Sequence, residues 1–149
     1  MKIEIDQSGK LEQLNTHTVV AYSNDTNGAV LLRIATKRLV LSKLRTSIIP
    51  HKDILPIWFA IVIFLLLDDT SSQAIIVIDE EYTGKEALIE ETLLKLFNKR
   101  FPKGWQGSIR FKKIGKSSPA HQLAWSLHRK NRGLVLRKLT YLEVMKLIK

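Results

Sequence analysis

The sequence predicts an α/β protein with a five-stranded mixed sheet and helices on both faces of that sheet. Two patterns carry this prediction. Three short strand-like segments come first and are separated by brief turns, which is typical of an antiparallel meander. Strand-like and helix-like segments then alternate, and this order requires parallel crossover connections. The predicted order is therefore β-β-β-α-β-α-β-α, followed by a short C-terminal appendage.

Alternation of apolar and acidic side chains defines the first strand, residues 2–6, which ends before a Ser-Gly turn. The second strand, residues 16–22, is rich in Thr and Val and ends at a turn signal over residues 23–28. Residues 29–35 form the third expected strand. Residues 40–44 either prolong that strand or lead out of it.

An apolar segment at residues 54–67 predicts a buried helix, with Asp53 as its N-cap and Pro56 in its first turn. The segment is shorter than the span of about 20 residues that crosses a bilayer, so no membrane partner is expected. Its apolar side chains cover every face of the helix. Either the sheet and a neighbouring helix cover it, or the sheet and a second copy of the chain do, which would make a homodimer.

The rest of the chain alternates between strand and helix signals. The expected elements are a strand at 75–78, a helix from a Thr83–Glu86 capping box to about Lys99, a strand at 108–114, a helix from about Pro119 to Lys130, an extended stretch at 134–139 and a last helix from a capping box at Thr140.

Length and composition indicate an ordinary globular domain. The 149 residues are 45% hydrophobic and 26% charged, which fits one domain over 1–149 with a core at about 1–131 and an appendage at about 132–149. The absence of cysteine excludes disulfides and thiolate metal sites. The first ten residues contain no hydrophobic signal region, so secretion is not expected and a cytoplasmic location is.

The net charge of +10 is concentrated in the last third of the chain. Residues 100–149 contain 13 basic residues and one acid, whereas residues 1–99 contain 11 basic residues and 13 acids. Such a basic block is typical of a surface that binds a polyanion, or of a solvated surface that keeps the protein soluble. Trp105 and Trp125 could stack on bases, although the core is the commoner place for such residues.

An acidic cluster follows the apolar run Ile75–Ile78, where Asp79, Glu80 and Glu81 are consecutive. A β-branched run without alternation predicts a strand buried on both faces, and the carboxyl ends of such strands face the ligand crevice of an α/β sheet. Mutual repulsion among three carboxylates favours a hard cation such as Mg²⁺ or Mn²⁺. A solvated acidic loop at the start of the next helix is the alternative. Alternation allows at most one of the two glutamates to point inward with Asp79.

The element order and these acids resemble the ribonuclease H-like superfamily over roughly residues 1–131. The resemblance implies that the first and fourth strands are parallel neighbours that end in metal-binding aspartates, here Asp6 and Asp79. It implies a third acid, usually Glu, at the first helix, where Asp53 stands; that residue is also a good helix cap. A fourth ligand falls on His121, in a stretch that also resembles a helix of Argonaute Piwi domains. A plain helix-surface histidine is the alternative there.

The same resemblance implies a nuclease that hydrolyses phosphodiester bonds in RNA or DNA by a two-metal mechanism with Mg²⁺ or Mn²⁺. Its catalytic and metal-binding residues would be Asp6, Asp53, Asp79 and His121. The alternative is a ribonuclease H-like binding or scaffold protein with a degenerate, inactive site. In either case, we expect the phosphate backbone of a nucleic acid to contact basic residues on both sides of the last core helix. These residues are Lys112, Lys113, Lys116, Arg129, Lys130 and Arg132.

Overall fold

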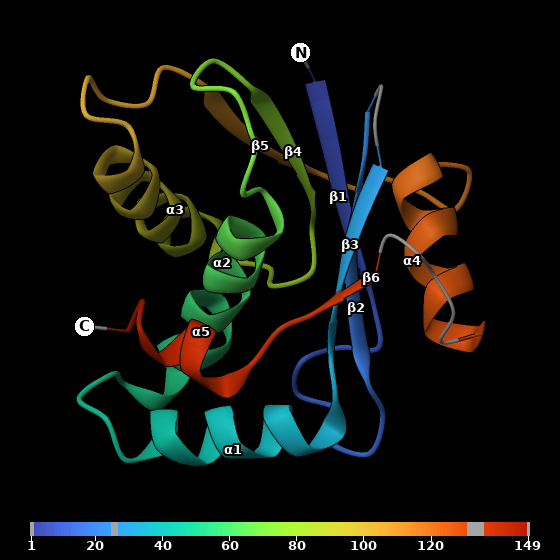
Figure 1. Ribbon diagram of the computed structural model, residues 1–149, viewed down its shortest axis with the longest axis vertical. Coiled ribbons are helices and arrows are strands. Elements are labelled where there is room, and N and C mark those ends of the chain that lie inside the picture. The colour runs from blue at the N-terminus through green and yellow to red at the C-terminus, as the bar shows by residue number, and fades with distance from the viewer. Residues whose placement is uncertain (1, 25–26, 131–135, 149) are drawn as a thin grey trace.

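A computed structural model describes residues 2–24, 27–130 and 136–148 (Figure 1). Within these residues, six strands form one mixed sheet in the spatial order β5-β4-β1-β2-β3-β6. The strands are β1 (Lys2–Ser8), β2 (Thr18–Ser23), β3 (Asn27–Leu32), β4 (Ile75–Asp79), β5 (Ser108–Lys112) and β6 (Leu136–Lys138). The α-helices are α1 (Ile34–Arg45), α2 (Ile54–Leu66), α3 (Glu86–Arg100), α4 (Pro119–Lys130) and α5 (Tyr141–Met145), and a 3₁₀ turn, η1 (His51–Asp53), precedes α2.

The strand directions confirm an α/β fold with a mixed sheet. Strands β1, β2 and β3 form an antiparallel meander. Strands β4 and β5 add to β1 in parallel, as the strand-helix alternation predicts. The expected number of five strands is wrong, because β6 pairs in parallel with β3 at the other edge.

Helices cover both faces of the sheet unequally (Figure 1). Helices α1, α2, α3 and α5 share the main core with side chains such as Ile3 and Ile5 of β1. Helix α4 packs alone on the opposite face, where Ala124 and Leu127 meet β2 and β3 in a smaller core. Alternation along β1 therefore turns Glu4 and Asp6 toward the face that carries α4.

Helix α2 lies at the centre of the main core, and eleven of its thirteen residues are buried. The sheet, α1, α3 and α5 all contact it, so the chain itself covers its apolar faces. The structure therefore gives no support to a homodimer through this helix. No helix in the described ranges has both the length and the apolar character needed to cross a membrane.

Helix α1 replaces the end of the third expected strand, so the strand prediction for residues 33–35 is wrong, and residues 40–44 lie in the helix and do not prolong the strand. Lys37, Val40, Leu41 and Leu44 are its buried residues, and they recur at intervals of three or four. This is the spacing of one helix face. The pattern is hard to recognise in the sequence because a lysine, here Lys37, is seldom buried. In the structure its Nζ donates to the carbonyl oxygens of Lys10, Gln13 and Thr16 at 3.1, 2.5 and 2.8 Å.

The predicted helix starts have different outcomes. Helix α4 begins at Pro119, as expected, and Ser118 Oγ accepts from the backbone N–H of Ala120 at 3.2 Å. The capping box at Thr140 is present at the start of α5. The Thr83–Glu86 capping box is absent, since α3 begins at Glu86 and Lys85 at its N-cap makes no side-chain capping bond. Asp53 occupies the N-cap position of α2, also without a capping bond.

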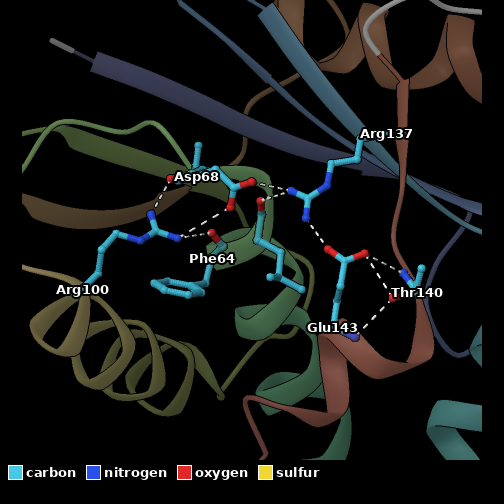
Figure 2. Close-up of polar contacts among 8 residues, drawn as sticks. Phe64, Asp68, Arg100, Arg137, Thr140 and Glu143 are labelled. Atoms are coloured by element: carbon cyan, nitrogen blue, oxygen red, sulfur yellow. Dashed lines mark hydrogen bonds and ion pairs between the residues drawn. The ribbon is translucent and has the colours of Figure 1, made fainter.

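Two arginines fasten α2 to its neighbours at its C-terminal end (Figure 2). Arg100 of α3 donates to the carbonyl oxygen of Leu67 at 2.7 Å and lies over the ring of Phe64. Arg137 of β6 donates to the carbonyl oxygen of Leu65 at 3.1 Å and pairs with Asp68 and Glu143. The segment expected as an appendage thus adds a strand to the sheet and a helix to the main core.

Candidate metal centre

The parallel pairing of β1 with β4 brings two aspartates together. Ile5 lies opposite Ile78, so the next residues along the two strands, Asp6 and Asp79, are neighbours; Asp79 ends β4, and Asp6 lies two residues before the end of β1. Asp6 is buried, with 3% of its surface exposed. The structure therefore places these two predicted ligands side by side.

Glu81 completes a group of three carboxylates. Asp6, Asp79 and Glu81 each offer one oxygen, and these oxygens lie within 4.8 Å of one another. Glu80 is exposed, and its backbone N–H donates to the carbonyl oxygen of Lys112 at 3.2 Å. One of the two glutamates after Asp79 thus points inward. We call Asp6, Asp79 and Glu81 the acidic triad.

Hydrogen bonds hold the two aspartates of the acidic triad in place. The backbone N–H of Gln7 donates to Asp6 Oδ1 at 2.8 Å, and His121 Nδ1 of α4 lies 2.7 Å from Asp6 Oδ2. The backbone N–H of Ile114, beyond the end of β5, donates to Asp79 Oδ1 at 2.8 Å. Each aspartate keeps a second oxygen or lone pair for a further ligand.

Two carboxyl groups of the acidic triad, those of Glu81 and Asp6, have pKa values above their ordinary range. The pKa of Glu81 is raised to about 7, and burial is the largest cause. The hydrogen bond with Asp79 and the negative charges of Asp79 and Asp6 raise it further. Burial also raises the pKa of Asp6, together with the charge of Asp79, while the hydrogen bond from His121 opposes this shift. A cation between the three groups would favour their ionised forms.

The donor set fits a hard divalent cation. Three carboxylates at this separation are the oxygen ligands that Mg²⁺ and Mn²⁺ take. Gln7, next to Asp6, is 7% exposed, and its Oε1 has no hydrogen-bond partner among the described residues. The side-chain amide of Gln7 also forms a hydrogen bond with Glu81, and this bond lowers the pKa of that carboxyl. Gln7 therefore favours the ionised form of Glu81.

The other two predicted metal ligands, His121 and Asp53, are not part of the acidic triad. His121 reaches the acidic triad through Asp6, but its ring nitrogens are not among the three clustered donor atoms. Asp53 is not among them either, and its Oδ1 pairs with Lys85 Nζ at 3.3 Å. The structure therefore joins Asp6, Asp79 and His121 and leaves Asp53 in an ion pair.

The predicted nucleic-acid-binding residues that the structure describes are all exposed: Lys112, Lys113, Lys116 and Arg129. Lys112 Nζ lies 3.9 Å from Glu4 Oε2. Arg132 and the side chain of Lys130 lie outside the described residues.

The two tryptophans that could stack on bases differ in their exposure to solvent. Trp105 is buried and stacks on Phe97, with 4.7 Å between ring centroids. Trp125 is 49% exposed on α4, so the expectation of a core position is wrong for this residue. Helix α4 buries Ala120, Ala124 and Leu127 instead.

Reasoning from the sequence left open which of Glu80 and Glu81 points inward, and it missed Gln7 as a neighbour of the site. Glu81 had a usable signal, because residues two apart in an extended chain point to the same side and Glu81 is two residues after Asp79. Gln7 had none, since its importance depends on burial. No protein-family model matches this chain, and a search of curated proteins also found no match.

Proposed function

We propose that this protein is a divalent-metal-dependent nuclease with a ribonuclease H-like fold, which hydrolyses phosphodiester bonds in RNA or DNA. The observation that carries the proposal is the acidic triad, which lies where the parallel strands β1 and β4 approach their carboxyl ends, with donor oxygens within 4.8 Å of one another. Carboxylates so arranged hold the cations that phosphodiester hydrolysis uses.

The strand order supports the proposed fold. An antiparallel meander, β1 to β3, with β4 and β5 added in parallel to β1 agrees with the sheet that the superfamily resemblance implies. Asp6 and Asp79 stand where that resemblance places its strand-end aspartates, and α4 brings His121 to Asp6. The extra strand β6 and the pairing of Asp53 with Lys85 are departures from it.

Each residue of the site has a role that its contacts suggest. Mg²⁺ or Mn²⁺ bound there would activate a water molecule and offset charge on the leaving oxygen. Asp6 and Asp79 would hold the cation with their clustered oxygens. Glu81, with a pKa of about 7, would ionise as the cation binds. His121 orients Asp6 through the 2.7 Å contact and acts as a positioning residue.

The basic surface supplies a means to hold the substrate. Lys112, Lys113 and Lys116 are exposed at the end of β5 and in the loop that leads to α4. The same loop contains Ile114, whose N–H binds Asp79. Phosphate groups held by these lysines would therefore lie beside the acidic triad, and such contacts act without reading base sequence.

Replacement of Asp79 by Asn tests the proposal. An amide oxygen can still accept from Ile114, so the fold should persist while the charge needed by the cation is lost. We expect the wild-type protein to nick labelled RNA or DNA with Mn²⁺ or Mg²⁺, and Asp79→Asn to reduce the rate at least about 100-fold. Glu80→Gln, at the exposed neighbour, is the matched control and should cleave normally. Cleavage that survives both chelation and Asp79→Asn would contradict a metal-dependent nuclease.

The pairing of Asp53 with Lys85 favours one alternative, a nucleic-acid-binding or scaffold protein whose site is degenerate. In that case the acidic triad would bind no divalent ion, and the basic surface would still bind a polyanion. Isothermal titration calorimetry with Mn²⁺ separates the two functions. Heat that disappears in Asp79→Asn supports the nuclease, whereas no Mn²⁺ binding together with salt-sensitive oligonucleotide binding supports the alternative.

A further inference from the structure

Helix α4 carries an exposed aromatic and basic stripe that begins at the candidate metal centre. His121, Trp125 and Arg129 are each four residues apart, so they lie on one side of the helix. The first of them contacts Asp6 of the acidic triad at 2.7 Å. Four residues advance a helix by about 6 Å, so Trp125 lies one turn from that contact and Arg129 lies two turns from it.

The exposure of Trp125 stands out against the other tryptophans. Trp58 and Trp105 are 0% and 8% exposed, whereas Trp125 is 49% exposed. Exposed apolar side chains occur singly on most protein surfaces, so what sets Trp125 apart is its contact with Arg129 and its place one turn from His121.

Arg129 gives the exposed ring a fixed partner. The centre of its guanidinium group lies 4.8 Å from the centroid of the Trp125 ring. This cation–π contact joins a flat aromatic surface to a positive charge. We call the two residues the Trp125–Arg129 shelf.

We propose that the Trp125–Arg129 shelf stacks an unpaired base of a single-stranded nucleic acid that reaches the acidic triad along α4. A tryptophan ring takes any unpaired base on its face, and an arginine beside it contacts the adjoining phosphate. Bases within a duplex are already stacked on their neighbours and leave no face free. The inference rests on the proposed function for the polymer that is bound, and it adds that the bound segment is single-stranded.

Binding measured without metal tests the shelf independently of cleavage. In EDTA, a fluorescein-labelled single-stranded oligonucleotide is titrated with wild-type protein and with Trp125→Ala, in DNA and RNA forms. Alanine is a good helix former and the site is exposed, so α4 should remain folded, which circular dichroism checks. Leu39→Ala is the matched control, because Leu39 is 58% exposed on α1, on the opposite face of the sheet.

We expect Trp125→Ala to weaken binding of single strands about tenfold or more, while Leu39→Ala binds as the wild type does. An oligonucleotide of the same length with abasic sites should bind wild type and Trp125→Ala equally, because it offers phosphates without bases. Binding of the normal single strand should also quench tryptophan fluorescence, and this quenching should vanish in Trp125→Ala.

Several results would overturn the shelf. These are equal affinity of wild type and Trp125→Ala for single strands, an equal loss with the abasic oligonucleotide or with a duplex, or no binding of single strands at all. Failure of the proposed nuclease is a separate result: single strands would bind with the expected dependence on Trp125, and neither Mn²⁺ nor Mg²⁺ would support cleavage.

Discussion

Glu81 shows how one residue can connect the site to the stability of the fold. Its carboxyl lies with Asp6 and Asp79, and burial together with those neighbours raises its pKa to about 7 from an ordinary value of 4.5. Without a cation, the folded chain therefore holds a proton that the unfolded chain releases at lower pH. A divalent cation competes with that proton for the same oxygens.

The raised pKa of Glu81 predicts how stability depends on pH in metal-free buffer. Between pH 4.5 and 7 the folded state binds more protons than the unfolded state, so the free energy of unfolding falls as the pH rises. Glu81→Gln removes this linkage and should make the fall shallower, leaving the part due to Asp6. Urea unfolding at several pH values measures it. Glu80→Gln should retain the wild-type slope, and equal slopes for all three proteins would contradict the prediction.

The sequence predicted only part of the candidate site, and the reasons lie in particular side chains. The meeting of Asp6 with Asp79 could be expected, because adjacent parallel strands align their carboxyl ends. The pairing of Asp53 with Lys85 could not, because it joins residues 32 positions apart whose side chains meet only in the folded chain. The exposure of Trp125 was misjudged because tryptophan is highly buried on average.

At the scale of elements, the strands were easier to predict than the first helix and the C-terminal segment. Alternation and β-branched runs mark β1, β2, β4 and β5 directly in the sequence. Helix α1 was missed because Lys37 occupies a buried position of its apolar face. Strand β6 was expected only as an extended stretch, since a short strand gains its place from pairing with β3 and not from its own residues.

The docking of the C-terminal segment should depend strongly on Val144, the buried residue of α5. Val144 is 0% exposed and belongs to the main core, whereas Leu142 of the same helix is 69% exposed. Val144→Ala should lower the free energy of unfolding by about 2 kcal/mol, because it leaves a small cavity beside α1 and α2. Leu142→Ala should change it by no more than about 0.5 kcal/mol. Chemical denaturation measures both, and similar losses in the two variants would show that α5 does not dock as described.

At the scale of the whole molecule, acidic residues form the candidate metal centre and basic residues form the proposed binding surface for nucleic acid. The acids of the site come from the first 99 residues, and the last 50 carry 13 of the 24 basic residues. The fold brings the two sets together, because β5 and the loop after it lie next to β4 and its terminal Asp79. A nucleic acid bound to the basic residues of β5 and the following loop would therefore lie close to the carboxylates of the acidic triad.

This arrangement predicts a salt dependence that two lysines control. Lys113→Gln with Lys116→Gln should reduce the slope of log affinity against log salt concentration by about 1.4 for single strands, since each phosphate contact contributes about 0.7. The same exchange at Lys43 and Arg45, exposed on α1 at the other face, should leave the slope unchanged. Fluorescence anisotropy over a range of NaCl concentrations measures both slopes. A slope that falls equally in both double variants would mean that the basic surface near Asp79 is not the binding surface.

The position of β5 at the end of the sheet has a consequence for solubility. An outermost strand exposes unpaired backbone groups that can recruit another chain and start aggregation. Here Arg110 and Lys112 stand exposed at alternate positions of that strand. Two positive charges facing their equivalents in a second molecule would repel it. Lys112, which we expect to contact a polyanion, would thus also act with Arg110 to keep copies of the protein from pairing edge to edge.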